Sequence, residues 1–334
     1  MMWDYLIQTI QTRNISDIHI HADERVALRE LGDVVMDDKI FSNDDIKNFL
    51  KKELSDSDFL FFLENKDFDF AIAQGDVRFR VNAFQQSDLF ALVLRKIESK
   101  IPSFDDLNLP PFIRTVPTIE TGLVLVTGPT GSGKSTTLAS IIDVINQSQK
   151  GHIITIEDPK EFVHRSKNCV FSQREVGRDT KSFLNALRAS LREDPDVILV
   201  GELRDLETIQ LALTAAETGH LVFGTLHTNS APSTIMRIID VFPPSQQDQI
   251  RSQLSSTLRC VLTQKLIKRI DEPGRVAAFE LMINNTAIGN LIRENKVFQI
   301  ENVMQTARGD GMMQMANSIK TLIAERKIDP SQSL

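Results

Sequence analysis

Residues 128–136 carry the spacing G-x-x-x-x-G-K-S, with Gly128, Gly133, Lys134 and Ser135 at its fixed positions. An apolar and β-branched run at 123–127 precedes them, as in a buried strand, and helical apolar spacing follows at 138–145. Glycines between a strand and a helix let backbone N–H groups converge on phosphate oxygens, and the helix N-terminus adds partial positive charge. A ligand-free glycine turn would have no use for Lys134 and Ser135. The pattern therefore predicts a phosphate-binding loop.

The ligand expected in this loop is ATP with Mg²⁺. The Lys134 ammonium is expected to reach the β- and γ-phosphates, and the Ser135 hydroxyl to bind Mg²⁺. The predicted nucleotide-binding residues are consecutive: Gly128, Pro129, Thr130, Gly131, Ser132, Gly133, Lys134, Ser135 and Thr136.

Polar residues follow three further predicted strands. Glu157 and Asp158 come after the apolar run 152–156, Glu202 after 197–200 and His227 after 221–225. Glu202 stands where a P-loop NTPase keeps its Mg²⁺-side acid, although the strand here ends in Gly-Glu. The carboxyl ends of parallel strands converge on the nucleotide, where acids hold Mg²⁺ or orient water and a polar group senses the γ-phosphate. Each residue alone also fits a solvated loop charge or helix cap, but three beside a phosphate loop favour a catalytic site.

Phosphoryl transfer also needs positive charge against the transferring group, often from an arginine. Arg78, Arg80 and Arg95 lie on predicted strands of the first domain, and the first two share a strand face. The alternative is that they pair with the excess acids of that domain. Three arginines in or beside the nucleotide domain stay undecided: Arg188, Arg192 and Arg204.

The periodicity predicts two α/β domains joined by a linker. Residues 1–98 alternate as helices flanking a meander of strands, which makes an α+β module. Its predicted helices are 3–13, 42–54 and 57–64, and its predicted strands are 16–21, a hairpin at 25–35 turning near Gly32, 68–73, 77–85 and 89–97. His19 and His21 share a strand face, but no third metal ligand is nearby, which favours a plain strand.

Residues 99–117 hold four prolines and little periodicity, and are expected to form an extended linker. From 118 to 334, strands alternate with helices, as in a doubly wound parallel sheet. The predicted strands are 123–127, 152–156, 170–171, 197–200 and 221–225, and the predicted helices are 134–146, 181–192, 206–217 and 231–239. A mainly helical region is expected after 243–244, with a hairpin at 260–281.

The amino-acid composition excludes several kinds of binding partner and cellular setting. Residues 1–116 hold 14 of the 38 Lys and Arg residues but 21 of the 45 Asp and Glu residues, so the net charge of −7 arises there. Neither part offers the basic surface that nucleic-acid binding needs, and no direct nucleic-acid partner is expected. No apolar run approaches the ~20 residues of a membrane span, and no basic segment marks a signal peptide. Cys169 and Cys260 stand alone, which favours a reducing cytoplasm and speaks against structural zinc.

Taken together, these segments resemble the secretion ATPase superfamily of type IV pilus and type II/IV secretion motors, and most of all its twitching-motility retraction subfamily. The matching segments are the Walker A box at 128–136, the aspartate box at 153–161, the atypical Walker B box at 196–202, the histidine box at 218–231, the N-terminal stretches 16–20 and 77–83, and the retraction motif at 290–294, continued at 298–315. Three places depart from the family pattern: residues 23–25, residues 29–32 and Lys160.

The resemblance implies a homohexamer in which a PAS-like N-terminal domain packs on the RecA-like ATPase domain of the next subunit. Arg78, Arg80 and Arg95 then match positions that contact the neighbour's nucleotide. Glu157 matches the proposed catalytic base, Glu202 the Mg²⁺-side acid and His227 the residue linking nucleotide to domain movement.

The function expected from this resemblance is an ATP-hydrolysing motor for type IV pilus retraction. It is expected to be cytoplasmic and peripheral at the inner membrane, where it would act on a platform protein. The absence of a four-cysteine site, the short N-terminal region and the motif ending in Arg293 and Glu294 favour retraction over assembly. A secretion or DNA-uptake ATPase is the alternative within the superfamily. A nucleic-acid translocase and a non-hydrolysing scaffold are the alternatives outside it.

Overall fold

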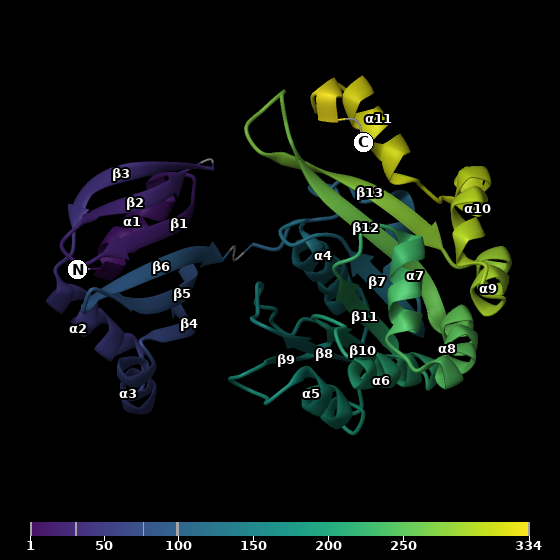
Figure 1. Ribbon diagram of the computed structural model, residues 1–334, viewed down its shortest axis with the longest axis horizontal. Coiled ribbons are helices and arrows are strands. Elements are labelled where there is room, and N and C mark those ends of the chain that lie inside the picture. Colours follow the sequence, from purple (N-terminus) through teal and green to yellow (C-terminus); the bar gives the residue numbers. More distant parts are fainter. Residues whose placement is uncertain (1, 31, 76, 98–99, 333–334) are drawn as a thin grey trace. The chain divides into compact units, whose positions relative to one another are not determined.

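The computed structural model describes residues 2–30, 32–75, 77–97 and 100–332, and the chain divides into two units, 1–100 and 101–334 (Figure 1). Leu31 in the predicted first hairpin, and residues 98 and 99 at the predicted domain boundary, lie outside the described residues. Each unit has its own sheet and its own core, and each is described by itself.

The first unit is a six-stranded antiparallel sheet in the order β3-β2-β1-β6-β5-β4. Its elements are α1 (Met2–Thr12), β1 (Ile15–His21), β2 (Arg25–Glu30), β3 (Asp33–Ile40), α2 (Asn43–Glu53), α3 (Asp56–Asn65), β4 (Asp67–Gln74), β5 (Val77–Gln86) and β6 (Leu89–Ile97). The predicted helices and strands are confirmed, although β1 pairs with β6 from the far end of the unit rather than continuing a simple meander.

Alternation along the strands gives this sheet one buried face. Ile18 and Ile20 of β1 are fully buried in a cluster that includes Leu6 of α1 and Ile46 and Leu50 of α2. Helix α2 begins where Ser42 and Asp45 form a reciprocal capping box, which satisfies backbone N–H groups that the helix leaves open. The helices therefore cover one face of the sheet, and the intervening side chains of each strand occupy the other.

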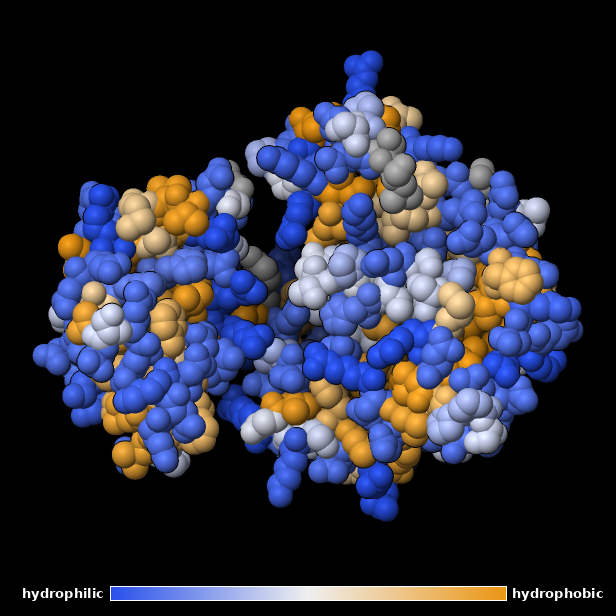
Figure 2. Space-filling model, in the orientation of Figure 1, coloured by the Kyte–Doolittle hydropathy of each residue, from blue (hydrophilic) through white to orange (hydrophobic). Residues whose placement is uncertain are grey.

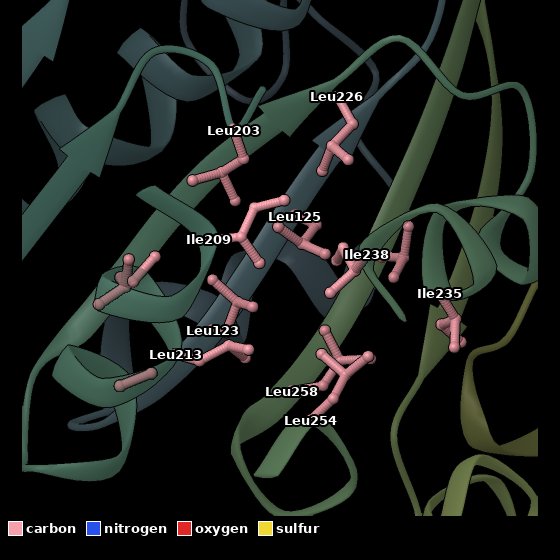
Figure 3. Packing of buried hydrophobic residues seen from close by; sticks show 14 of the residues in the cluster. Leu123, Leu125, Leu203, Ile209, Leu213, Leu226, Ile235, Ile238, Leu254 and Leu258 are labelled. Carbon is pink, nitrogen blue, oxygen red and sulfur yellow. The ribbon is translucent and has the colours of Figure 1, made fainter. Parts of the chain in front are cut away.

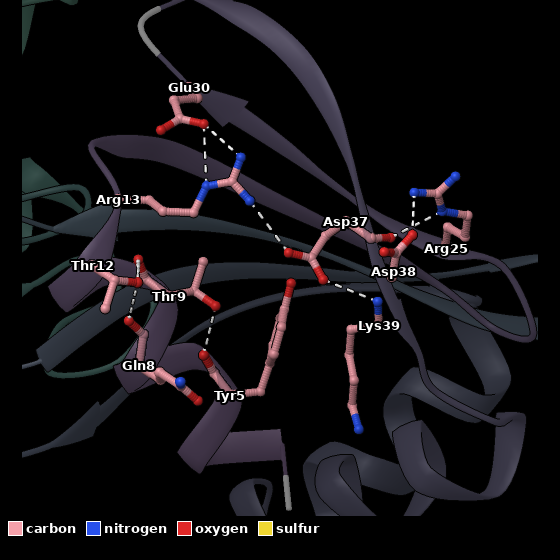
Figure 4. A network of polar contacts seen from close by, with 10 residues as sticks. All are labelled: Tyr5, Gln8, Thr9, Thr12, Arg13, Arg25, Glu30, Asp37, Asp38 and Lys39. Carbon is pink, nitrogen blue, oxygen red and sulfur yellow. Dashed lines mark hydrogen bonds and ion pairs between the residues drawn. The ribbon is translucent and has the colours of Figure 1, made fainter.

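A network of polar contacts connects Arg13, which follows α1, to the β2–β3 hairpin (Figure 4). Arg13 donates to Glu30 at 2.6 Å and to Asp37 at 3.3 Å, while Arg25 donates to Asp38 at 2.5 Å. Burial, together with the nearby Asp37 carboxylate, raises the pKa of Tyr5 to about 12. The β2–β3 hairpin, where the sequence departs from the family pattern, is therefore stabilised by ion pairs with Arg13 and Arg25. Pairs of this exposure contribute about 0–1 kcal/mol each.

Residues 101–118 differ from the extended linker expected at 99–117. Phe104, Leu109, Ile113 and Val116 are buried in a cluster with the sheet and α4 of the second unit. Residues Pro111–Thr118 form a 3₁₀ helix, η1, with a proline at its start and another inside it. The prolines therefore shape a segment that packs on the second unit, because its apolar side chains gain more from burial than from exposure.

The second unit is built on a seven-stranded sheet in the order β13-β12-β7-β11-β10-β8-β9, parallel except for the β12–β13 hairpin. Its strands are β7 (Gly122–Thr127), β8 (His152–Glu157), β9 (Val170–Glu175), β10 (Val197–Val200), β11 (Leu221–Leu226), β12 (Leu258–Lys268) and β13 (Arg275–Ile283). Its α-helices are α4 (Lys134–Ser148), α5 (Phe183–Ser190), α6 (Leu206–Glu217), α7 (Ala231–Asp240), α8 (Pro244–Thr257), α9 (Thr286–Arg293), α10 (Ile300–Thr306) and α11 (Met315–Ala324).

Both faces of the central strand β7 are buried. Leu123 and Leu125 pack toward Ile209 and Leu213 of α6 (Figure 3), while Val124 and Val126 belong to the cluster on the opposite face with α4. A strand covered on both faces reads as a continuous apolar run, which is why 123–127 could be recognised in the sequence. The predicted parallel α/β core is confirmed.

Hydrophilic side chains predominate on the drawn faces of both units, with apolar groups scattered between them (Figure 2). Among the described residues, no helix combines the length and the apolar character needed to cross a membrane.

Candidate active site

Four neighbouring parallel strands end at one edge of the second sheet, and a predicted site residue lies at or just after the end of each. In sheet order, β7 leads into the phosphate loop, β11 into His227, β10 into Glu202, and β8 ends at Glu157. The strand that follows β7 along the chain, β8, is separated from it in the sheet by β11 and β10. Parallel pairing therefore brings residues from distant parts of the sequence to one edge.

The loop backbone requires glycine at two positions. Gly128 has φ +140°, and a Cβ there would lie 2.3 Å from the carbonyl oxygen of Gln264. Gly133 has φ +87° and forms the N-cap of α4 without a capping side chain. A helix N-terminus with no side chain over its N–H groups leaves those donors to an anion.

The Lys134 side chain lies against the backbone of the phosphate loop. Its ammonium donates to the carbonyl oxygens of Gly128 at 2.8 Å and Pro129 at 3.1 Å, and the residue is 9% exposed. Burial lowers the pKa of Lys134, and the negative charge of Glu202 opposes that shift. The charged amine is thus held over the loop rather than in solvent.

The loop residues fit a phosphate ligand. Ser132 is 2% exposed, and its Oγ is buried without a hydrogen-bond partner among the described residues. Ser135, expected to bind Mg²⁺, is half-buried in the first turn of α4. An unpartnered buried hydroxyl, open helix N–H groups and an adjacent ammonium form the donor set that phosphate oxygens need.

Glu157 is oriented by two donors that bind the same oxygen. Thr155 Oγ1 donates to Glu157 Oε1 at 2.7 Å, and Gln173 Nε2 donates to it at 3.0 Å. Burial raises the pKa of Glu157, and the two hydrogen bonds only partly offset that rise. Since both donors from the described residues take Oε1, Oε2 is left to accept a proton, as a general base must.

Glu202 and His227 follow the neighbouring strands β10 and β11 and lie in contact with each other. His227 Nε2 lies 3.3 Å from Glu202 Oε1, and Arg204 Nη2 lies 2.7 Å from Glu202 Oε2. Burial alone would raise the pKa of Glu202, but Arg204 and His227 outweigh it and lower that pKa. An ionised carboxylate beside the phosphate loop is suited to hold Mg²⁺, directly or through water.

The three predicted arginine fingers share the open face of the first unit. Arg80 and Arg95 are directly opposite each other on β5 and β6, and Arg78 follows the same alternation. Arg95 donates to Asp17 at 2.8 Å, and Arg80 lies 3.7 Å from Asp69. Both arginines therefore form the ion pairs with acids of their own unit that were the alternative to a role at the nucleotide. Arg78 differs, since its Nη1 is buried with no partner among the described residues. Their role toward a nucleotide stays a prediction.

Sequence reasoning missed several residues that support the site. Gln264 of β12 contacts the phosphate loop, and Gln173 of β9 holds Glu157. Arg204, left undecided from the sequence, is an ion-pair partner of Glu202. Gln264 stands between Thr263 and Lys265 in the predicted hairpin, so no local pattern in the sequence singled it out.

Near the C-terminus, Arg293 and Glu294 both have partners within the unit. Arg293 donates to Ser255 of α8 at 3.3 Å, and Glu294 accepts from Lys296 at 2.7 Å. Helix α9 is thereby tied to α8.

A sequence model of the family described as "Type II/IV secretion system protein" matches residues 2–328. This chain belongs to that family. The type II/IV secretion system protein family therefore accounts for nearly the whole chain, and the resemblance seen in the four boxes is confirmed.

Relatives within the family point to one branch of it. The "Twitching motility protein" of Neisseria gonorrhoeae is 48% identical over 94% of this chain and 82% of its own length. The "Type IV pilus retractation ATPase PilT" of Pseudomonas aeruginosa is 56% identical over 80% of this chain and 77% of its own. A crystal structure described as the pilus retraction motor PilT with bound ADP is 46% identical, covers 99% of this chain and 95% of that one, and has a TM-score of 0.92. The predicted fold, an N-terminal domain with a RecA-like ATPase domain, is confirmed, as is the ATPase class.

Proposed function

We propose that this chain hydrolyses ATP to power the retraction of type IV pili. The observation that carries the proposal is the convergence of the phosphate loop, Glu157, and the Glu202–His227 pair on one sheet edge. Its relatives in N. gonorrhoeae and P. aeruginosa, named for twitching motility and pilus retraction, support the choice of filament.

In the proposed reaction, the loop N–H groups and Lys134 bind the phosphates of ATP. Ser135 and Glu202 would hold Mg²⁺, and a bound ion there would supply positive charge beside the phosphoryl group. Glu157 takes a proton from the attacking water through Oε2, and burial raises its pKa, which makes it a stronger base than an exposed glutamate. His227, whose Nε2 lies 3.3 Å from Glu202 Oε1, couples the presence of the γ-phosphate to the position of the loop before α7.

The working form that we propose is a homohexamer. In it, Arg78, Arg80 and Arg95 of one subunit approach the nucleotide of the next, and Arg78 brings a donor that no described residue of its own chain satisfies. Domain movement in this ring turns a platform protein at the cytoplasmic side of the inner membrane. No direct nucleic-acid contact is part of the proposal.

The decisive experiment is deletion of the gene in its source bacterium, followed by complementation. We expect surface pili to accumulate and twitching to stop, with rescue by the unchanged chain but not by Lys134→Ala. A strain without pili would identify an assembly motor, and normal pili with a secretion or DNA-uptake defect would assign the chain to that alternative.

A further inference from the structure

Strand β12 runs past the end of β7 and lies along the phosphate loop. The last paired residues of the two strands are Thr263 and Thr127, whose hydroxyls are 2.9 Å apart. Gln264 comes next: it still pairs with Phe279 of β13 on one side, but on the β7 side it lies beside the loop. Its carbonyl oxygen is where a Cβ on Gly128 would collide, at 2.3 Å.

The Gln264 side chain bridges the loop and the helix after it. Nε2 donates to the Ser132 carbonyl oxygen at 2.6 Å, and Oε1 accepts from Thr137 Oγ1 at 2.9 Å. The residue is 2% exposed. The two bonds fix which end of the amide is which, because a carbonyl accepts only from the NH₂ group and the Thr137 hydroxyl donates to the oxygen.

Holding the Ser132 carbonyl also orients the next N–H group. The peptide unit is planar and trans, so the C=O of Ser132 and the N–H of Gly133 point in opposite directions. With the carbonyl turned toward Gln264, the Gly133 N–H is turned away from β12. In a loop of this pattern, backbone N–H groups at that turn are the phosphate donors.

We propose that Gln264 is a positioning residue for nucleotide binding, which fixes the Ser132–Gly133 peptide plane so that the Gly133 N–H faces the phosphates. This rests on the proposed function, in which the loop binds ATP. Gln264 itself does not touch the ligand. Its contribution is that the loop is held in its binding conformation before the ligand arrives, which spares the ligand the cost of ordering the loop.

Two substitutions distinguish a role of Gln264 in orienting the loop from a role in stabilising the core alone. Gln264→Met keeps the length and removes both hydrogen bonds. Gln264→Glu keeps the acceptor for Thr137 but sets a carboxylate oxygen against the Ser132 carbonyl. Protonation of that carboxyl restores an O–H donor in the place of Nε2, and burial of the site favours the neutral acid.

The test is titration of the full chain with ADP by calorimetry between pH 8 and pH 5.5, with the unchanged chain measured at each pH. Lys268→Gln, an exposed position on the same strand, is the matched control. We expect both Gln264 variants to bind ADP about tenfold or more weakly at pH 8, from loss of a buried hydrogen bond. At pH 5.5 the ADP affinity of Gln264→Glu should approach that of the unchanged chain, whereas Gln264→Met should stay equally weakened at every pH.

Three results would overturn the inference. Folded variants that bind ADP within threefold of the unchanged chain at every pH would leave Gln264 a purely structural residue. So would a Gln264→Glu deficit that does not change with pH. If Gln264→Glu does not fold, the ADP affinity of Gln264→Met decides alone. An unchanged chain that binds no ADP would instead refute the proposed function, and this inference with it.

Discussion

Glu157→Gln is the substitution that isolates the proposed general base. Thr155 and Gln173 both donate to Oε1, so the glutamine carbonyl is expected to take that place and keep both hydrogen bonds. Its NH₂ group then replaces Oε2 and has no lone pair for a proton. The change therefore removes the base while leaving the fold and the contacts of the site in place.

The expected loss follows from that single function. A positioned base contributes about 10²–10⁴-fold to the rate, or about 3–5 kcal/mol of the barrier. We expect kcat to fall by that factor and the affinity for ATP to change little. Steady-state phosphate release and equilibrium nucleotide binding, measured on the same preparation, give the two quantities.

The pH profile provides an independent reading. The base must be ionised, so kcat/KM of the unchanged chain should fall as the pH drops through the raised pKa of Glu157. Thr155→Val is the matched control, because it keeps the carboxylate, removes one donor and should move this acid limb to higher pH. A Glu157→Gln chain that binds ATP and retains kcat within a few fold, with the acid limb intact, would refute the assignment.

Four further predictions address the rest of the site and the core. Lys134→Ala should abolish turnover and weaken ADP binding, and near-normal ATPase activity would contradict the loop assignment. Arg204→Ala should raise the pKa of Glu202, so the Mg²⁺ concentration for half-maximal activity should rise more at pH 6 than at pH 8; an equal rise at both would contradict this linkage. Arg80→Ala mixed with Lys134→Ala should regain activity in verified mixed oligomers, and no regain would favour a structural arginine. Leu125→Ala should lower the free energy of unfolding by about 2–5 kcal/mol in urea titrations, and a loss below 1 kcal/mol would contradict close packing.

The sequence was informative where local pattern and function coincide. The strand and helix around Lys134, and the residues at the ends of three other strands, could be predicted because parallel strands share an edge. Gln264 could not, since its role depends on β12 pairing beside β7, which no local periodicity encodes.

Segment ends and the proline-rich stretch were harder for a related reason. Helix α5 spans Phe183–Ser190 rather than 181–192, because Ser182 caps its start and the chain turns after Ser190. At 101–118, the prolines led to the prediction of an extended linker, whereas Pro111–Thr118 form the 3₁₀ helix η1. The burial of Phe104 and Ile113, however, depends on the surface against which the segment packs, which lies elsewhere in the chain.

The order of the strands along the chain determines which unit can fold first during synthesis. The first unit is closed by β1 and β6, with Asp17 opposite Arg95, so its sheet is complete before the phosphate loop is translated. The loop follows β7, whose two neighbours are β11 at 221–226 and β12 at 258–268. A growing chain thus carries the loop sequence long before it carries the strands that hold the loop. Since domains fold as units from the N-terminus, the nascent protein passes through a stage with a finished first unit and an unformed nucleotide site.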